Sequence, residues 1–137
     1  MQISPYLFFN GNCAEAFRFY EKCLGGKIKF LMTYGESPEA AKIPAEMHNK
    51  VIHASLQVGE HVFSGSDDCS ADGFKRPQGF SVSISTKDPE EAKRIFHALS
   101  ENGTVTLAID KTFWSPAFGM LVDQYGIPWM VNTEGQA

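Results

Sequence analysis

The feature that most constrains this chain is a helix that occurs twice with the same flanking signals. Asn12-Cys-Ala-Glu15 and Asp88-Pro-Glu-Glu91 both fit the capping box, in which a polar side chain and a glutamate three positions later satisfy free N–H groups at a helix start. Each segment stops at Gly25-Gly26 or Asn102-Gly103, as a left-handed C-terminal cap requires. The repeat distance is 76 residues at the caps (91 − 15) and 77 at the glycines (103 − 26), which predicts a duplicated module.

Both helices carry one apolar stripe at helical spacing, and β-rich runs surround them. The stripes are Cys13, Ala16, Phe17, Tyr20 and Leu24 in the first helix, and Ala92, Ile95, Phe96 and Leu99 in the second. Strands are expected at 3–9, 27–34, 51–58, 61–66, 80–86, 104–108, 120–122 and 127–132, and a long loop at 35–50 with room for one helical turn. The sequence therefore predicts an α+β fold of two tandem βαβββ modules. One domain would span 1–137, with module 1 at about 1–67, a linker at 68–79 and module 2 at about 80–134.

Charge, apolar content and cysteine spacing indicate which binding partners and which location to expect. The chain has 137 residues, a net charge of −4 and interspersed charges, so nucleic acid and anionic membranes are not expected partners. No segment approaches the roughly 20 apolar residues that a membrane span needs. The first residues do not resemble a signal peptide, and three cysteines without CxxC spacing fit reduced thiols, so a cytoplasmic location is expected.

Particular residues carry a resemblance to a known family. Pro5-Tyr-Leu-Phe-Phe-Asn-Gly-Asn12, His53-Ala54, Ser66-Asp67 and the closing Phe113-Trp114, Phe118-Gly119-Met120 and Trp129-Met130 are similar to the PhnB-like branch of the vicinal-oxygen-chelate superfamily. The resemblance implies a cupped mixed sheet of the glyoxalase and bleomycin-resistance type, and a homodimer. Members of this branch have carried a demethylubiquinone methyltransferase label. The residues here lack the glycine-rich strand-to-helix turn that a Rossmann-type methyltransferase needs.

In metal-dependent relatives, His, Glu or Gln side chains on the concave face of the cup hold a divalent ion. The corresponding positions fall on Pro5, Ser64, Ser81 and Met130, which are poor ligands for such metals. His53 and His61 point to opposite faces of the expected hairpin, so they cannot chelate together. The sequence therefore predicts no metal and no cofactor.

The polar face of the expected hairpin should line the cup. His53, Ser55, Ser64 and Ser66 share that face, and Ser81 and Ser83 join it from the second module. Imidazole exchanges a proton near neutral pH, so His53 could act as a general base or hydrogen-bond donor; a structural histidine bonded to Ser66 or a backbone carbonyl is the alternative. Asp67 is interpreted as a turn cap rather than a catalytic group.

Trp114 and Phe118 are expected in a loop before the last hairpin. They would form either an aromatic lid over the ligand or a hydrophobic dimer contact. The function that follows is binding of a small molecule in the cup without a metal. The alternatives are a divalent-metal-dependent enzyme of the glyoxalase or dioxygenase type, and an interaction protein with a vestigial cup.

Overall fold

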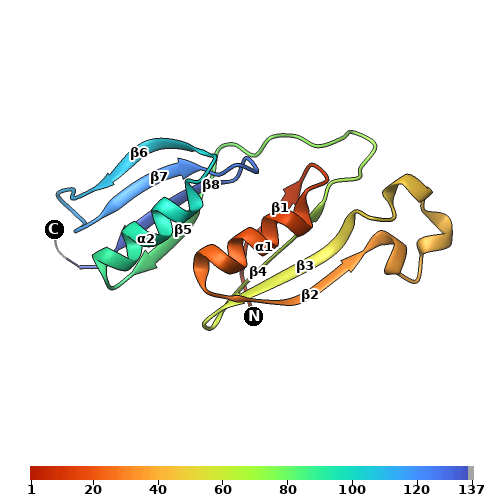
Figure 1. Cartoon of the computed structure of the whole chain (residues 1–137), viewed down its shortest axis with the longest axis horizontal. Helices are drawn as coiled ribbons and strands as arrows, with labels where there is room; N and C mark the ends of the chain where they lie inside the picture. Colours follow the sequence, from red (N-terminus) through yellow and green to blue (C-terminus); the bar gives the residue numbers. More distant parts are fainter. Residues whose placement is uncertain (136–137) are drawn as a thin grey trace. The chain divides into compact units, whose positions relative to one another are not determined.

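The computed structural model describes residues 1–135 and divides into two compact units, residues 1–75 and 76–137. Each unit is one βαβββ module (Figure 1). Unit 1 contains β1 (Tyr6–Phe9), α1 (Cys13–Leu24), β2 (Lys27–Thr33), β3 (Val51–Val58) and β4 (His61–Asp67). Unit 2 contains β5 (Val82–Thr86), α2 (Pro89–Leu99), β6 (Thr104–Asp110), β7 (Phe118–Val122) and β8 (Pro128–Thr133). The duplicated module is confirmed, and the union of both modules in one domain stays a prediction.

The two sheets have the same topology. Unit 1 has the strand order β1-β4-β3-β2 and unit 2 has the order β5-β8-β7-β6. The first strand of each unit runs parallel to the last, and the other pairs are antiparallel. The predicted α+β class and its two βαβββ modules are therefore confirmed, and each module forms its own four-stranded mixed sheet.

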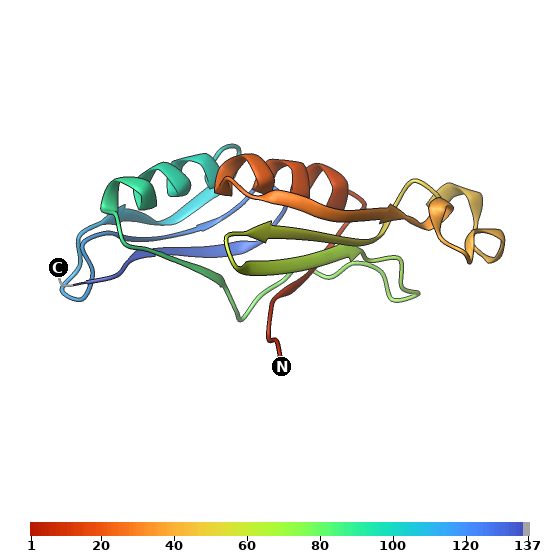
Figure 2. The same ribbon diagram turned by 90° about the horizontal axis from the view of Figure 1, so that it is seen from below.

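One helix covers one face of each sheet, and the core lies between them (Figure 2). In unit 1, Phe17 and Tyr20 of α1 pack on Phe9 and Phe63 of the sheet, with ring centroids 5.6–6.3 Å apart. In unit 2 the largest buried side chain is Trp129 of β8. Its Nε1 donates to Asp123 Oδ2 at 2.8 Å.

The start of α1 differs from the prediction. Asn12 precedes the helix but forms no capping hydrogen bond, and its buried Oδ1 has no partner in the described part of the chain. The carboxylate of Asp67, from the end of β4, takes its place: Oδ1 accepts from the backbone N–H of Cys13 at 2.9 Å. A residue 54 positions away therefore supplies the cap that sequence reasoning assigned to the local side chain.

The other helix ends are closer to expectation. Gly25 adopts the left-handed conformation after α1, at φ 71°. Asp88 caps α2, although it accepts from the N–H of Glu90 rather than from Glu91. After α2 the left-handed residue is Asn102, at φ 58°, and the helix already ends at Leu99.

The long loop of unit 1 is more ordered than predicted. It contains three short 3₁₀ turns, Tyr34–Glu36, Ala40–Lys42 and Ala45–Met47, where one turn was expected. His48 Nε2 donates to the carbonyls of Ala40 and Ile43 at 3.0 and 2.9 Å, which ties the last two turns together. In the described residues, no helix has the length and apolar character that crossing a membrane requires.

Candidate functional site

The alternation of each strand separates a helix-covered face from a helix-free face in unit 1. Ala54, Leu56 and Phe63 are buried on the side of α1. Ser55 pairs directly with Ser64, Tyr6 pairs with Ser64, and Met32 pairs with His53. Because paired residues point to the same side of a sheet, these polar and aromatic side chains share the helix-free face. The predicted hairpin around Gly59-Glu60, and the face assignment that depends on it, are therefore correct.

His53 lies at the centre of an aromatic cluster on this helix-free face. Its ring is stacked with Tyr6 and tilted against Phe30, with both centroid separations at 5.7 Å. Tyr6 also contacts Phe8, with centroids 5.2 Å apart. Tyr6, Phe8 and Phe30 are 42%, 52% and 43% exposed, which is unusual for side chains of this size. We call Tyr6, Phe8, Phe30 and His53 the aromatic cluster.

The imidazole of His53 uses its Nδ1 atom in a hydrogen bond with Tyr6, which leaves the Nε2 atom for a ligand. The Tyr6 hydroxyl lies 3.1 Å from His53 Nδ1, so the partner is neither Ser66 nor a backbone carbonyl, the two expected from sequence. When the tyrosine O–H donates to Nδ1, the neutral imidazole carries its proton on Nε2. In the described residues Nε2 has no hydrogen-bond partner. Nε2 is therefore available to a ligand between two aromatic faces, as an N–H donor in this tautomer and as an acceptor when Nδ1–H donates to the Tyr6 hydroxyl.

The serines predicted as ligand-binding residues fall into two groups. Ser55 and Ser64 lie beside the aromatic cluster and are partly exposed, whereas Ser66 is 6% exposed. Ser83 pairs with Met130 in unit 2, and Ser81 precedes β5. The structure therefore brings His53, Ser55 and Ser64 together within unit 1, and describes Ser81 and Ser83 in unit 2 by themselves.

Trp114 and Phe118 of unit 2 were both predicted in a loop, and this is wrong for Phe118. It is the first residue of β7 and is 8% exposed, because it pairs with Asn132 and lies under Trp114. The Trp114 and Phe118 centroids are 5.4 Å apart, and Phe113 packs on Trp114 at 4.7 Å. Phe113 and Trp114 are the exposed members, at 92% and 48%.

The residues at the metal positions of the superfamily do not fit a divalent ion. Pro5 offers no side-chain donor, and Ser64, Ser81 and Met130 offer only weak ones. Within the described part of the chain, no group of three or more His, Cys, Asp and Glu side chains is arranged to hold a metal.

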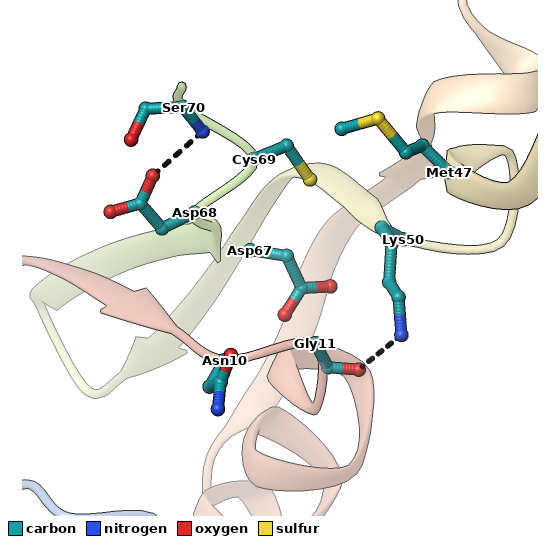
Figure 3. Close-up of a pocket in the computed structure, with 8 residues that line it drawn as sticks. All are labelled: Asn10, Gly11, Met47, Lys50, Asp67, Asp68, Cys69 and Ser70. Carbon is teal, nitrogen blue, oxygen red and sulfur yellow. Dashed lines mark hydrogen bonds between the residues drawn. The ribbon is translucent and has the colours of Figure 1, made fainter. Parts of the chain in front are cut away.

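A pocket of about 310 Å³ lies where β1 and β4 end (Figure 3). It is lined by Asn10, Gly11, Met47, Lys50, Asp67, Asp68, Cys69 and Ser70. Asp67 forms its floor and is only 3% exposed. Besides the bond to Cys13, its Oδ2 accepts from the N–H of Val51 at 2.8 Å. Asp67 therefore clamps the start of α1 to the start of β3, which is a larger structural role than the predicted turn cap.

Tyr34 interacts electrostatically with one residue of the pocket, Cys69, and with one of the aromatic cluster, Tyr6. Its hydroxyl shares a hydrogen bond with the Cys69 thiol, and burial, then the neighbouring Cys69, raise the pKa of Tyr34. The Tyr6 hydroxyl is close enough to Tyr34 to raise that pKa further. Burial also raises the pKa of Cys69, and the charges of Asp67 and Asp68 add to this effect. At neutral pH the Cys69 side chain is therefore a thiol rather than a nucleophilic thiolate.

Sequence reasoning missed Tyr6, Phe8 and Phe30 as members of the site. Tyr6 to Phe9 is an unbroken run of large apolar residues, so alternation gives no sign of which two face away from the core. In β2, register shifts near Phe30 and Met32 break the regular count along the strand. Only the parallel pairing of β1 with β4 in the structure, which places Tyr6 opposite Ser64 and Phe8 opposite Ser66, shows that Tyr6 and Phe8 face away from the core.

Comparison with known proteins gives a consistent assignment. A family model described as 3-demethylubiquinone-9 3-methyltransferase matches residues 1–132. Protein YjdN of Escherichia coli K12 is 33% identical over 148 aligned residues, covering 99% of this chain and 97% of YjdN. The crystal structure of protein PA1353 from Pseudomonas aeruginosa is 42% identical, with a TM-score of 0.90 and 98% of each chain covered.

A further solved structure is described as a putative 3-demethylubiquinone-9 3-methyltransferase, PhnB protein, from Bacillus cereus. It is 25% identical to this chain, with a TM-score of 0.78, and covers 98% of this chain and 100% of its own. The resemblance stated from the residues alone is thereby confirmed. The chain belongs to the PhnB-like family described as 3-demethylubiquinone-9 3-methyltransferase, and its fold is that of the glyoxalase and bleomycin-resistance proteins.

Proposed function

We propose that this protein binds a small organic molecule with a planar ring on the helix-free face of unit 1, and that it does so without a metal ion. The observation that carries the proposal is the aromatic cluster, in which an imidazole with a free Nε2 lies between the rings of Tyr6 and Phe30. Exposed aromatic side chains stack on planar ligands, and one convergent donor fixes the orientation of the ligand.

The polar surroundings specify the ligand further. Ser55 and Ser64 are paired across β3 and β4 beside the cluster, and their hydroxyls both donate and accept. A ring that carries oxygen substituents would satisfy them together with His53 Nε2–H. The ligand class is therefore a planar, oxygen-substituted ring compound.

The methyltransferase activity in the family description has no support in the geometry of this chain. Each unit has one helix on one face of a small mixed sheet, whereas the Rossmann plan has helices on both faces of a parallel sheet. The β1-to-α1 turn is Asn10-Gly11-Asn12, and the carboxylate of Asp67 already occupies the helix start. That negative charge would repel an anionic cofactor group from the position where helix termini bind such groups.

The alternative of a divalent-metal-dependent enzyme requires ligands that the superfamily positions lack here, as Pro5 and Met130 show. A homodimer and a cytoplasmic location, both expected from sequence, stay predictions.

A binding titration with a matched pair of histidine variants tests the proposal. The probe is 2-naphthaleneacetamide, a neutral two-ring compound whose fluorescence reports binding directly. His53→Ala should weaken binding by roughly 5- to 150-fold, the equivalent of about 1–3 kcal/mol for a lost polar contact. His61→Ala is the control, because His61 is exposed at the far end of the same hairpin.

Native mass spectrometry before and after a chelator tests the metal-free part. We expect no divalent ion in the spectrum and no change in probe affinity on chelation. One chelator-sensitive ion per chain whose removal abolishes binding would make the metal-dependent enzyme the leading reading. Equal effects of His53→Ala and His61→Ala would remove His53 from the site.

A further inference from the structure

We infer that the pocket around Lys50 binds an anionic group, so that the ligand is a ring compound with a carboxylate, or a similar anion, on a short arm. This inference rests on the proposed function and adds a second contact point to it. It follows from the surroundings of Lys50 and from the position of the pocket beside the aromatic cluster.

Lys50 has a free charge inside a cavity. Among the described residues that line the pocket, it is the only cation. Its ammonium is part-buried and has one long hydrogen bond, 3.4 Å to the carbonyl of Gly11. The ion pairs of the described residues join Lys42 to Glu39, Lys93 to Glu90 and Arg94 to Glu91, and none includes Lys50. A part-buried ammonium without a counter-ion favours the binding of an anion.

The backbone of Gly11 holds the ammonium at this position. A Cβ atom on residue 11 would lie 2.8 Å from Lys50 Nζ, so the absence of a side chain leaves the space that the lysine occupies. Gly11 also has φ +87°, which L side chains rarely adopt. The backbone at Gly11 therefore fixes the position of the Lys50 ammonium, which does not extend freely into solvent.

The two carboxylates of the pocket do not compete for Lys50. Both oxygens of Asp67 accept from backbone N–H groups, and its charge lies at the positive end of α1. Asp68 Oδ1 accepts from the N–H of Ser70 at 2.9 Å, and Figure 3 shows the Asp68 side chain turned away from Lys50. Neither carboxylate of the pocket therefore forms an ion pair with the ammonium of Lys50.

The pocket lies within reach of a ligand bound at the aromatic cluster. Asn10 follows Phe8 by two residues, a separation of roughly 7 Å along an extended chain. The N–H of Asp68 donates to the carbonyl of Phe9 at 2.8 Å, so the pairing of the two strands continues to the edge of the pocket. Tyr34 forms a hydrogen bond with Cys69 of the pocket, and Tyr6 of the aromatic cluster also raises the pKa of Tyr34. An arm of two or three bonds does not cover this distance by itself, but the long axis of a two-ring system and such an arm together span it.

The experiment compares two probes of nearly the same shape, 2-naphthaleneacetate with a negative charge and neutral 2-naphthaleneacetamide, in which an NH₂ group replaces one carboxylate oxygen. Their affinities are measured for the full-length protein and for Lys50→Met, Lys50→Arg and Lys42→Met, with circular dichroism as the folding check. Lys42 is the matched control, because it lies in the same loop with a side chain that is 82% exposed.

The wild-type protein should prefer the acetate by roughly tenfold, the range of a charge-assisted hydrogen bond in a partly solvated site. Lys50→Met should weaken binding of the acetate more than binding of the amide and so abolish this preference, whereas Lys50→Arg and Lys42→Met should keep it. Added salt should reduce the preference, because it screens a partly exposed pair. Asp68→Asn should increase it, since a nearby negative charge is removed.

The outcomes separate the inference from the proposed function. If both probes bind with equal affinity to the wild-type protein, the anion site is refuted and ring binding stands. A parallel loss of both probes in Lys50→Met assigns the lysine a packing role and also refutes the anion site. If neither probe binds, the proposed function fails and the inference fails with it.

Discussion

Replacing Asp67 with alanine leaves two buried N–H groups without acceptors. The groups are those of Cys13 and Val51, which now donate to Asp67 at 2.9 and 2.8 Å. Each unsatisfied buried donor costs about 1–3 kcal/mol, and the lost charge at the start of α1 adds about 0.3–1 kcal/mol. The expected loss in the free energy of unfolding is therefore about 2–7 kcal/mol. A typical domain has only about 5–15 kcal/mol in total, so this variant should be close to unfolding.

Asp88→Ala provides the matched control, because Asp88 caps the other helix of the duplicated module. Its single acceptor bond, to the N–H of Glu90 at 3.0 Å, is exposed. The loss of such a cap costs about 1 kcal/mol. Asp67→Asn should lie between the two alanine variants, because an amide oxygen accepts from one N–H group while its NH₂ group cannot accept from the other.

The assay is urea unfolding followed by far-ultraviolet circular dichroism, which reports both units. Trp114 and Trp129 both lie in unit 2, so tryptophan fluorescence in the same titration reports that unit separately. Native-state hydrogen exchange then locates the effect, and the α1 amides should lose protection in Asp67→Ala. A loss no larger than that of Asp88→Ala would refute the claim that Asp67 holds the start of α1 and β3 together.

Three further predictions follow from groups outside the aromatic cluster. Burial and two neighbouring carboxylates raise the pKa of Cys69, so its reaction with a disulfide reagent should need a higher pH than that of a free cysteine. Asp68→Asn should shift this pH profile downward, and an unchanged profile would contradict the charge effect. Burial, and then Asp67, raise the pKa of Cys13 far above its ordinary value of 9.0. As the pH rises, the unfolded chain therefore loses the Cys13 proton before the folded chain does. The free energy of unfolding should then fall above about pH 9, by ~1.4 kcal/mol per pH unit. Cys13→Ala should reduce that alkaline slope in urea titrations, and an identical slope would show that Cys13 is not responsible. Gly119→Ala should lower stability by about 1–3 kcal/mol, because a Cβ there would lie 2.7 Å from Phe96; an unchanged urea midpoint would show that the neighbouring ring moves freely.

The sequence predicted the architecture because its signals are local. Capping residues, helical stripes and the glycine after α1 act within one turn of chain, and a 76-residue repeat of such signals leaves few alternatives to a duplicated module. The two-residue turn at Gly59-Glu60 fixed the register of β3 with β4, so the common face of His53, Ser55 and Ser64 followed from counting.

Tertiary structure decided how the site is completed, because its partners are far apart in the chain. Tyr6 reaches His53 across 47 residues and Asp67 caps Cys13 across 54, and no local pattern specifies such pairings. A polar residue before a helix predicts a cap only while no distant carboxylate satisfies the same N–H group, which is why Asn12 lost that role to Asp67. The unpaired charge of Lys50 also depends on tertiary structure. The sequence shows that a lysine is present, but only the fold determines that no carboxylate of the described residues pairs with it.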